Sequence, residues 1–259
     1  MSKSNPDPSP EKATMLVFDI KGFFAFFRKH FSTTSALSYS FPPRTTIAGI
    51  VAAALGYERD SYYTCFSSER CRIGLQVRSL VRHVTNAVNY LMTDGSITLE
   101  KLRGCGGSMP IHLDMLVSGE TEPLQLSYRI YFSHKDEELM GELSERIRVR
   151  KFLYPPSLGA ACNIAELEYI ALTEAEVYKP EGEVEVHTVL PVSALRRIYP
   201  RQGRIYLEEL VPAEFTEERR LKREESYVYE AEGRPIRVII SSEAFSCTVN
   251  GERIVGTFM

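Results

Sequence analysis

The order of strand-like and helix-like hydrophobic patterns between residues 15 and 178 constrains the fold most. The short apolar run MLVFDI at 15–20 is rich in strand formers, and a helical pattern follows between Pro43 and Gly56. Strand-like segments at 72–81 and 124–132, a helical pattern at 136–150 and an apolar segment at 169–177 come next. This strand-helix-strand-strand-helix-strand order is typical of a ferredoxin-like or RRM-type α+β unit.

The same patterns divide the chain into a tail and two domains. Residues 1–13 carry three prolines and no apolar periodicity, so we expect a disordered tail there. Residues 14–178 are expected to form the RRM-like domain, with an inserted β-hairpin arm at about 81–122 whose turn falls at Asp94-Gly95. Short strands separated by turn residues predict a small β-rich domain at 179–259.

Composition excludes several classes of protein. No uncharged apolar run approaches the roughly 20 residues that span a bilayer, and the N-terminus is polar and rich in Pro and Ser, so we expect a cytoplasmic protein without membrane contact. The five cysteines are scattered without a CxxC pair, and the five histidines have no HExxH-like spacing. The sequence therefore predicts no disulfide framework, no metal site and no cofactor.

Charge is distributed unevenly along the chain, although the net charge is only −3. Residues 15–114 hold eleven Lys and Arg against seven Asp and Glu, whereas residues 160–190 hold one Lys against seven Glu. The N-terminal half is therefore the half that could face a polyanion.

The segment KGFFAFFRKHF combines five phenylalanines with the basic side chains of Lys21, Arg28, Lys29 and His30. Stacking rings beside cations suit single-stranded RNA, because bases stack on the rings while cations neutralise the phosphates. The alternative is that most of these rings belong to the hydrophobic core and the cations are merely solvated.

The segment SYSFPPRTTIAG places Arg44 and two threonines at the start of the predicted helix, with Thr45 or Thr46 as its N-cap. The positive end of a helix favours an anion such as phosphate. Capping alone explains the threonines, but it does not explain a basic residue at this end.

Two further basic segments are candidates for contacts. The arm carries Arg82, His83, Lys101 and Arg103 near Met92 and Met109, and it is either an inserting hairpin or a surface loop. The cluster RRIYPRQGR at 196–204 is a second candidate, for which an exposed charge run is the simpler interpretation.

Three sequence blocks together resemble a known family. The N-terminal block at 18–56 (a strand, a glycine, an FR-containing loop and a PP-R-T-x-x-G helix) resembles the signature of the CRISPR-associated Cas-five family, RAMP-type subunits of Cascade complexes. YPPSLGAACNIAELEYI at 154–170 and SMPIHLDMLV at 108–117 resemble its other two blocks. The match runs from about 15 to 240 and looks closest to the I-B-like branch.

The resemblance implies a non-catalytic Cascade subunit in antiviral defence that binds and caps the 5′ handle of the crRNA. The arm would be a thumb on the backbone subunit, the large subunit would be a further partner, and target DNA would be contacted only indirectly. The implied RNA-binding residues are Lys21, Gly22, Arg28, Lys29, His30, Tyr39, Arg44, Thr45, Thr46, Arg82 and Arg103. The implied thumb contacts are Met92, Lys101 and Met109.

Two alternatives remain at this point. One branch of the family is a metal-independent ribonuclease that processes precursor crRNA with a tyrosine and a Lys-His pair. In this sequence Tyr39 stands where that tyrosine would be, and His83 is the candidate base. The Lys-His pair that the branch places downstream of the helix is missing. A ferredoxin-like unit also serves regulatory or structural proteins that bind no RNA.

Overall fold

The protein, described here from a computed structural model, is a mixed α/β fold made mostly of strands. The structure describes residues 11–32, 35–91, 98–105, 107–122 and 124–259. Its centre is a six-stranded sheet whose neighbouring strands all run antiparallel. In spatial order the strands are β16 (Glu252–Gly256), β15 (Ala244–Val249), β8 (Glu166–Tyr178), β1 (Glu11–Gly22), β7 (Leu126–His134) and β4 (Cys71–Val77).

Strand β1 is buried on both faces, which explains why its sequence is a continuous apolar run and not an alternating one. Leu16, Phe18 and Ile20 point into the larger hydrophobic cluster, whereas Met15 and Val17 belong to a second cluster on the opposite face. The strand begins at Glu11, so residues 11–13 of the expected tail pair with β8, and residues 1–10 lie outside the described residues.

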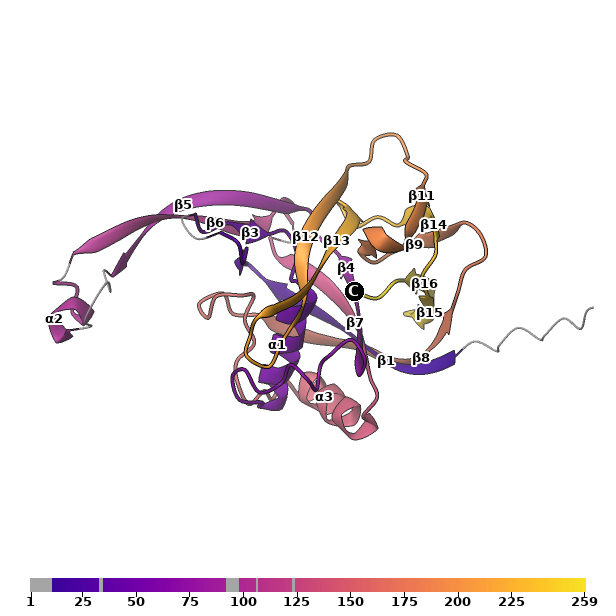
Figure 1. The fold of residues 1–259 in the computed structure, drawn as a ribbon, viewed down its shortest axis with the longest axis horizontal. Coiled ribbons are helices and arrows are strands. Elements are labelled where there is room, and N and C mark those ends of the chain that lie inside the picture. Colours follow the sequence, from indigo (N-terminus) through magenta and orange to yellow (C-terminus); the bar gives the residue numbers. More distant parts are fainter. Residues whose placement is uncertain (1–10, 33–34, 92–97, 106, 123) are drawn as a thin grey trace, which may run out of the picture.

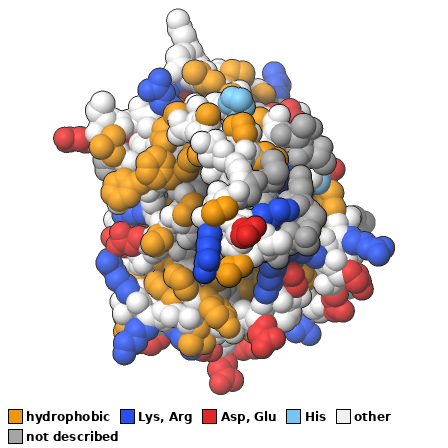
Figure 2. Space-filling view, turned by 90° about the vertical axis from the view of Figure 1, so that its left-hand side faces the viewer, with side chains coloured by type: hydrophobic (Ala, Val, Ile, Leu, Met, Phe, Trp, Pro, Cys, Tyr) orange, Lys and Arg blue, Asp and Glu red, His pale blue; other side chains and the backbone are white. Residues whose placement is uncertain are grey.

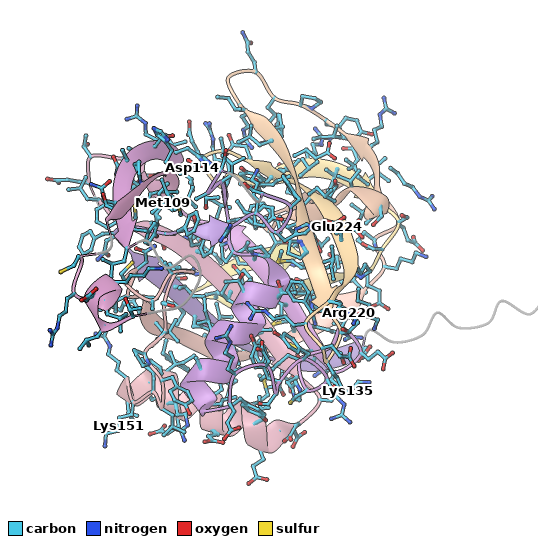
Figure 3. The ribbon with its side chains drawn as sticks, turned by 60° about the vertical axis from the view of Figure 1, so that its left-hand side comes forward. Met109, Asp114, Lys135, Lys151, Arg220 and Glu224 are labelled. Carbon is cyan, nitrogen blue, oxygen red and sulfur yellow. The ribbon has the colours of Figure 1, made fainter. Side chains whose placement is uncertain are left out.

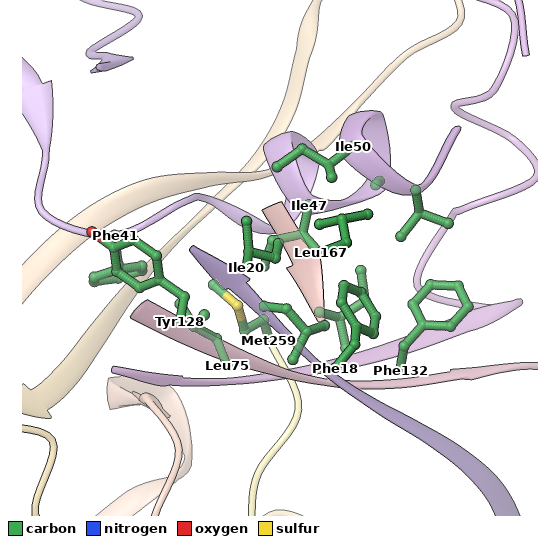
Figure 4. Packing of buried hydrophobic residues seen from close by; sticks show 14 of the residues in the cluster. Phe18, Ile20, Phe41, Ile47, Ile50, Leu75, Tyr128, Phe132, Leu167 and Met259 are labelled. Atoms are coloured by element: carbon green, nitrogen blue, oxygen red, sulfur yellow. The ribbon is translucent and has the colours of Figure 1, made fainter. Parts of the chain in front are cut away.

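Two helices cover one face of the sheet. Helix α1 (Arg44–Leu55) ends at Gly56, whose φ of 87° is the left-handed conformation that glycine adopts without strain. Helix α3 (Glu137–Val149) is capped by Asp136, whose carboxylate accepts hydrogen bonds from the backbone N–H groups of Glu138 and Leu139. Figure 4 shows the packing beneath them, with side chains of α1 lying over those of β1, β4, β7 and β8.

The C-terminal part of the chain builds two small sheets and then returns to the central one. One small sheet has the order β10 (Leu190–Pro191), β13 (Leu221–Glu230), β12 (Tyr206–Phe215), and the other β11 (Leu195–Ile198), β14 (Ile236–Ile240), β9 (Val184–Val186). A short 3-10 helix covers Val192–Ala194. The predicted boundary at 178 coincides with the end of β8, but β15 pairs with β8 and Met259 lies in the main cluster.

The arm leaves the body as a long hairpin (Figure 1). Strand β5 (Val81–Leu91) pairs along its whole length with β6 (Ser108–Ser118), and the short helix α2 (Leu99–Leu102) lies at the far end. The predicted turn at Asp94-Gly95 falls outside the described residues. At its base, β6 exchanges backbone hydrogen bonds with Ala25, so the arm is attached to the loop that follows β1.

That loop contains the two-stranded pair β2 (Phe27–Arg28) and β3 (Ser38–Tyr39). No helix among the described residues is long and apolar enough to span a bilayer.

Candidate nucleic-acid interface

A cleft of about 720 Å³ lies between the β2–β3 loop, the start of α1 and the β12–β13 hairpin. It brings together six of the residues singled out from the sequence, namely Arg28, Lys29, His30, Tyr39, Thr45 and Thr46. The hairpin adds Phe215 and Arg219, and none of the described residues that line the cleft is acidic. Its walls therefore offer cations, hydroxyl groups and rings, which are the groups that hold a single-stranded polyanion.

Two of the cations already have acidic partners from the hairpin. The Nζ atom of Lys29 lies 3.0 Å from Oε1 of Glu209, and Nε2 of His30 lies 2.9 Å from Oε1 of Glu224. Figure 3 labels Glu224 on the β12–β13 hairpin, which lies beside α1 in this view. Neither carboxylate is part of the cleft lining, and a bound phosphate would compete with them for these cations.

Tyr39 is the centre of a small network. Its hydroxyl lies 2.8 Å from Nδ1 of His30, and the ammonium group of Lys29 lies 5.4 Å from the centre of its ring. Burial is the main cause that raises the pKa of Tyr39 to about 12, because the side chain is 1% exposed and the phenolate would lose its hydration. Tyr39 is therefore a neutral hydroxyl at physiological pH.

The start of α1 differs from the prediction. The helix begins at Arg44 with Pro43 as the capping residue, and no side chain caps it, so the assignment of Thr45 or Thr46 as N-cap is wrong. Pro43 takes this position because proline has no N–H to lose and its fixed φ suits the entry to a helix. Both threonines instead line the cleft.

Arg44 is 2% exposed and does not line the cleft. Its Nη2 atom donates to the backbone carbonyl of Cys71 at 2.8 Å, and its Nε atom has no hydrogen-bond partner among the described residues. Burial lowers the pKa of Arg44, since it penalises the charged guanidinium. The expectation that Arg44 presents its charge to a phosphate in this cleft is therefore wrong; the residue faces a neighbouring cavity instead.

Lys21 and Gly22, at the end of β1, also lie outside the cleft lining. Lys21 forms an ion pair with Glu168 on β8. A Cβ atom at position 22 would come within 2.6 Å of Leu158, so close packing accounts for this glycine. The structure thus explains both residues without RNA.

The phenylalanines of the loop divide between core and surface. Phe27 is buried, whereas Phe23, Phe24 and Phe31 are more than half exposed. Exposed rings beside a basic cleft are suited to stack on bases, while Phe27 packs edge-on against Tyr128 in the core. The sequence pattern does not distinguish the phenylalanines of the core from those exposed on the surface.

The arm holds its predicted residues away from the cleft lining. His83 lies at its base, where Nδ1 is 2.9 Å from Oδ2 of Asp114 and Nε2 is 3.1 Å from the hydroxyl of Ser40. Arg82 is exposed beside it on β5, Lys101 is in α2, and Arg103 follows α2.

Several apolar side chains are exposed along the arm, most of them toward its far end. Met109 is 39% exposed on β6, and Met92 lies outside the described residues. The other large apolar side chains exposed in the described part of the arm are Val84, Tyr90, Leu91, Leu99 and Leu102. Figure 2 views this end of the molecule, where hydrophobic side chains lie among basic and acidic ones.

Sequence reasoning missed Arg219, which lies in the turn of the β12–β13 hairpin with a φ of 61°. The only signal was its position in the basic run ERRLKR, more than 170 residues after the loop that it faces. Among the described residues, no group of three or more His, Cys, Asp or Glu could hold a metal ion.

Comparison with known proteins gives one match in sequence and several in structure. The family described as "CRISPR-associated protein (Cas_Cas5)" matches residues 15–101. No curated protein matches the chain.

Among solved structures, a CRISPR protein from Archaeoglobus fulgidus is 14% identical, with a TM-score of 0.55 over 94% of this chain and 99% of that chain, so the two share a fold. A CRISPR RNA-guided surveillance complex (12% identity, TM-score 0.44, 86% of this chain and 90% of that one) and a Cas protein (14%, 0.41, 86% and 98%) are less similar. The family match contains β1, the cleft loop and α1, so this part of the chain is similar to the CRISPR-associated proteins of the Cas5 family.

Proposed function

We propose that this protein is a non-catalytic RNA-binding subunit of a CRISPR effector complex, and that its cleft holds the 5′ handle of the crRNA. The observation that carries the proposal is the cleft lining, in which Arg28, Lys29 and Arg219 converge from two distant parts of the chain. Phosphates would lie against these cations and the hydroxyl groups of Thr45 and Thr46. Exposed rings of the loop would stack on bases.

The proposal includes the RRM-type designation for the unit β1-α1-β4-β7-α3-β8. Its strands lie in the order β8-β1-β7-β4, with both helices on one face. This is the antiparallel arrangement that a split β-α-β unit adopts when its two halves interleave.

Retention of handle RNA tests the function directly. Arg28→Glu with Arg219→Glu should abolish retention of an end-labelled crRNA handle, because both changes place a negative charge on the cleft wall. Arg253→Glu, an exposed substitution on β16, is the matched control and should leave retention unchanged. Unchanged retention in the cleft variant, with a fold intact by circular dichroism, would refute the assignment.

The arm is the proposed contact with the backbone subunit, and the large subunit is a second proposed neighbour. Its support is the concentration of exposed apolar side chains toward its end, where a partner would bury them. Replacing residues 93–109 by a short Gly-Ser turn should weaken co-purification with the backbone subunit more than handle binding. Equal loss of both would contradict a separate docking role.

A second candidate is a crRNA-processing ribonuclease, favoured by one observation. Lys29 and His30, which precede the helix, both contact Tyr39, so a Tyr, a Lys and a His are assembled although their sequence positions are not those of the nuclease branch. His83, the base predicted from the sequence, contacts Asp114 and Ser40 instead. A neutral Tyr39 with a pKa near 12 is suited to donate a proton or a hydrogen bond, not to accept one.

Incubation of the protein with end-labelled repeat RNA in excess EDTA separates the two candidates. We expect intact RNA on a denaturing gel. Cleavage at one site that is lost in both Tyr39→Phe and His30→Ala would establish the nuclease, whereas loss in His83→Ala alone would assign the chemistry to the arm base.

A further inference from the structure

A second cavity, of about 460 Å³, adjoins the cleft on the other side of Thr45 and Phe215, which line both. Its walls come from α1, from the segment 62–69 and from the β12–β13 hairpin. Figure 3 shows the hairpin running beside α1, with Arg220 labelled near its turn. A nucleotide bound at Thr45 or Phe215 would therefore lie at the border of this cavity.

The cavity cannot be a phosphate site of the same kind as the cleft. Glu69, Glu214, Glu217 and Glu218 line it, and Lys222 is the one lysine beside them in its described lining. Burial opposes ionisation of Glu214, but hydrogen bonds from Ser68 and the ion pair with Lys222 outweigh burial and lower its pKa to about 2. This acidic wall repels phosphate, so the part of an RNA strand that suits it is an uncharged, hydrogen-bonding base.

Two polar groups of the lining bear on an occupant, the guanidinium of Arg44 and the carboxylate of Glu214. Arg44 is 2% exposed, and its Nε atom is buried without a hydrogen-bond partner among the described residues, so this N–H group is not presented at the cavity surface. The carboxylate of Glu214, which is 8% exposed, accepts hydrogen bonds from Ser68 at Oε1 and pairs at Oε2 with Lys222, 3.1 Å away, whose side chain is 59% exposed and free to move aside. The carboxylate can therefore take up further donors when Lys222 moves.

Rings provide the remaining walls. Tyr62, Tyr63 and Phe215 line the cavity, and Tyr63 packs edge-on against Phe215 with ring centres 6.1 Å apart. Flat apolar walls with a polar floor are the features by which proteins hold an unstacked base through its faces and its Watson–Crick edge.

We propose that this cavity is a base pocket that receives a guanine of the bound RNA strand. Guanine offers one acceptor, O6, beside two donors, N1–H and the N2 amino group. The carboxylate of Glu214 complements the two donors. Uracil offers a single donor, so it leaves the carboxylate less satisfied.

This inference rests on the proposed RNA-binding function, and the test separates the two. The probes are fluorescein-labelled ten-nucleotide RNAs, one all uridine and three with a single central guanosine, adenosine or cytidine, followed by fluorescence anisotropy. We expect the guanosine probe to bind at least tenfold more tightly than the all-uridine probe. No binding of any probe would overturn the RNA function itself, whereas equal binding of all four would overturn only the base pocket.

Three variants locate the preference. Glu214→Gln should bind the all-uridine probe as the wild type does and lose the guanosine preference, while Glu208→Gln, exposed on the same strand and outside this lining, should keep it. Lys222→Met should keep or increase the preference, because it frees the carboxylate. Loss of the preference in Lys222→Met, or its survival in a folded Glu214→Gln, would refute recognition by this carboxylate.

Discussion

The salt dependence of RNA binding can be derived from the cleft lining. Three permanently charged side chains, those of Arg28, Lys29 and Arg219, face the cleft. Each phosphate contact on a single strand contributes about −0.7 to the slope of log affinity against log salt, so three contacts give a slope of about −2. Raising salt from 50 to 200 mM should therefore weaken binding about 20-fold.

Arg219→Ala is the informative perturbation, because Arg219 is exposed and removing it leaves the core intact. The slope should fall to about −1.4 and the same salt change should weaken binding only about sevenfold, measured by anisotropy with an end-labelled handle. Arg253→Ala, at an exposed position of β16, should keep the wild-type slope. A wild-type slope in Arg219→Ala, or a slope near zero in the wild type, would refute an electrostatic clamp in this cleft.

Three other outcomes follow from particular contacts. Glu209→Gln should tighten handle binding, because it releases Lys29 from its 3.0 Å ion pair; weaker binding would show that the pair positions the lysine. Asp19→Asn should lower the free energy of unfolding, measured by chemical denaturation, by about 3–5 kcal/mol, because the charge of Arg129 would remain buried without its bidentate partner. The double variant Asp19→Leu with Arg129→Leu should lose much less, since it leaves no buried charge. Equal losses in the two variants would contradict this explanation. The pKa of Glu214 is lowered from about 4.5 in the unfolded chain to about 2 in the folded protein. Its ionised carboxylate therefore stabilises the fold above pH 4.5, and this contribution is lost as the pH falls toward 2. Glu214→Gln should flatten that part of a curve of unfolding free energy against pH, and an unchanged curve would contradict the lowered pKa.

Local pattern alone located several elements. The helical spacing after Pro43 and the stop at Gly56 predict α1 to within a residue or two, and the pattern at 136–150 predicts α3 equally well. The inserted segment at about 81–122 is the arm, whose paired strands run from 81 to 118. These features could be predicted because helical periodicity, proline and glycine act within a few residues of themselves.

One local signal was overlooked. Asn250-Gly251 between two alternating segments is a strong hairpin signal, and both residues have positive φ in the turn from β15 to β16. Even so, the sequence does not tell which strand the hairpin joins. Its pairing with β8 makes the C-terminal segment part of the central sheet.

The sequence by itself determined which residues of the cleft loop and of α1 lie close together, since they are neighbours along the chain. Only the tertiary structure decided that Arg44 is buried, that Lys29 and His30 meet Glu209 and Glu224, and that Arg219 completes the cleft. The physical reason is that periodicity acts between residues close in the sequence, so it assigns a side chain only to one face of its own helix or strand. The groups that neutralise or bury the charge of that side chain come from strands far along the chain. Packing of those strands therefore fixes which cations are available to a ligand.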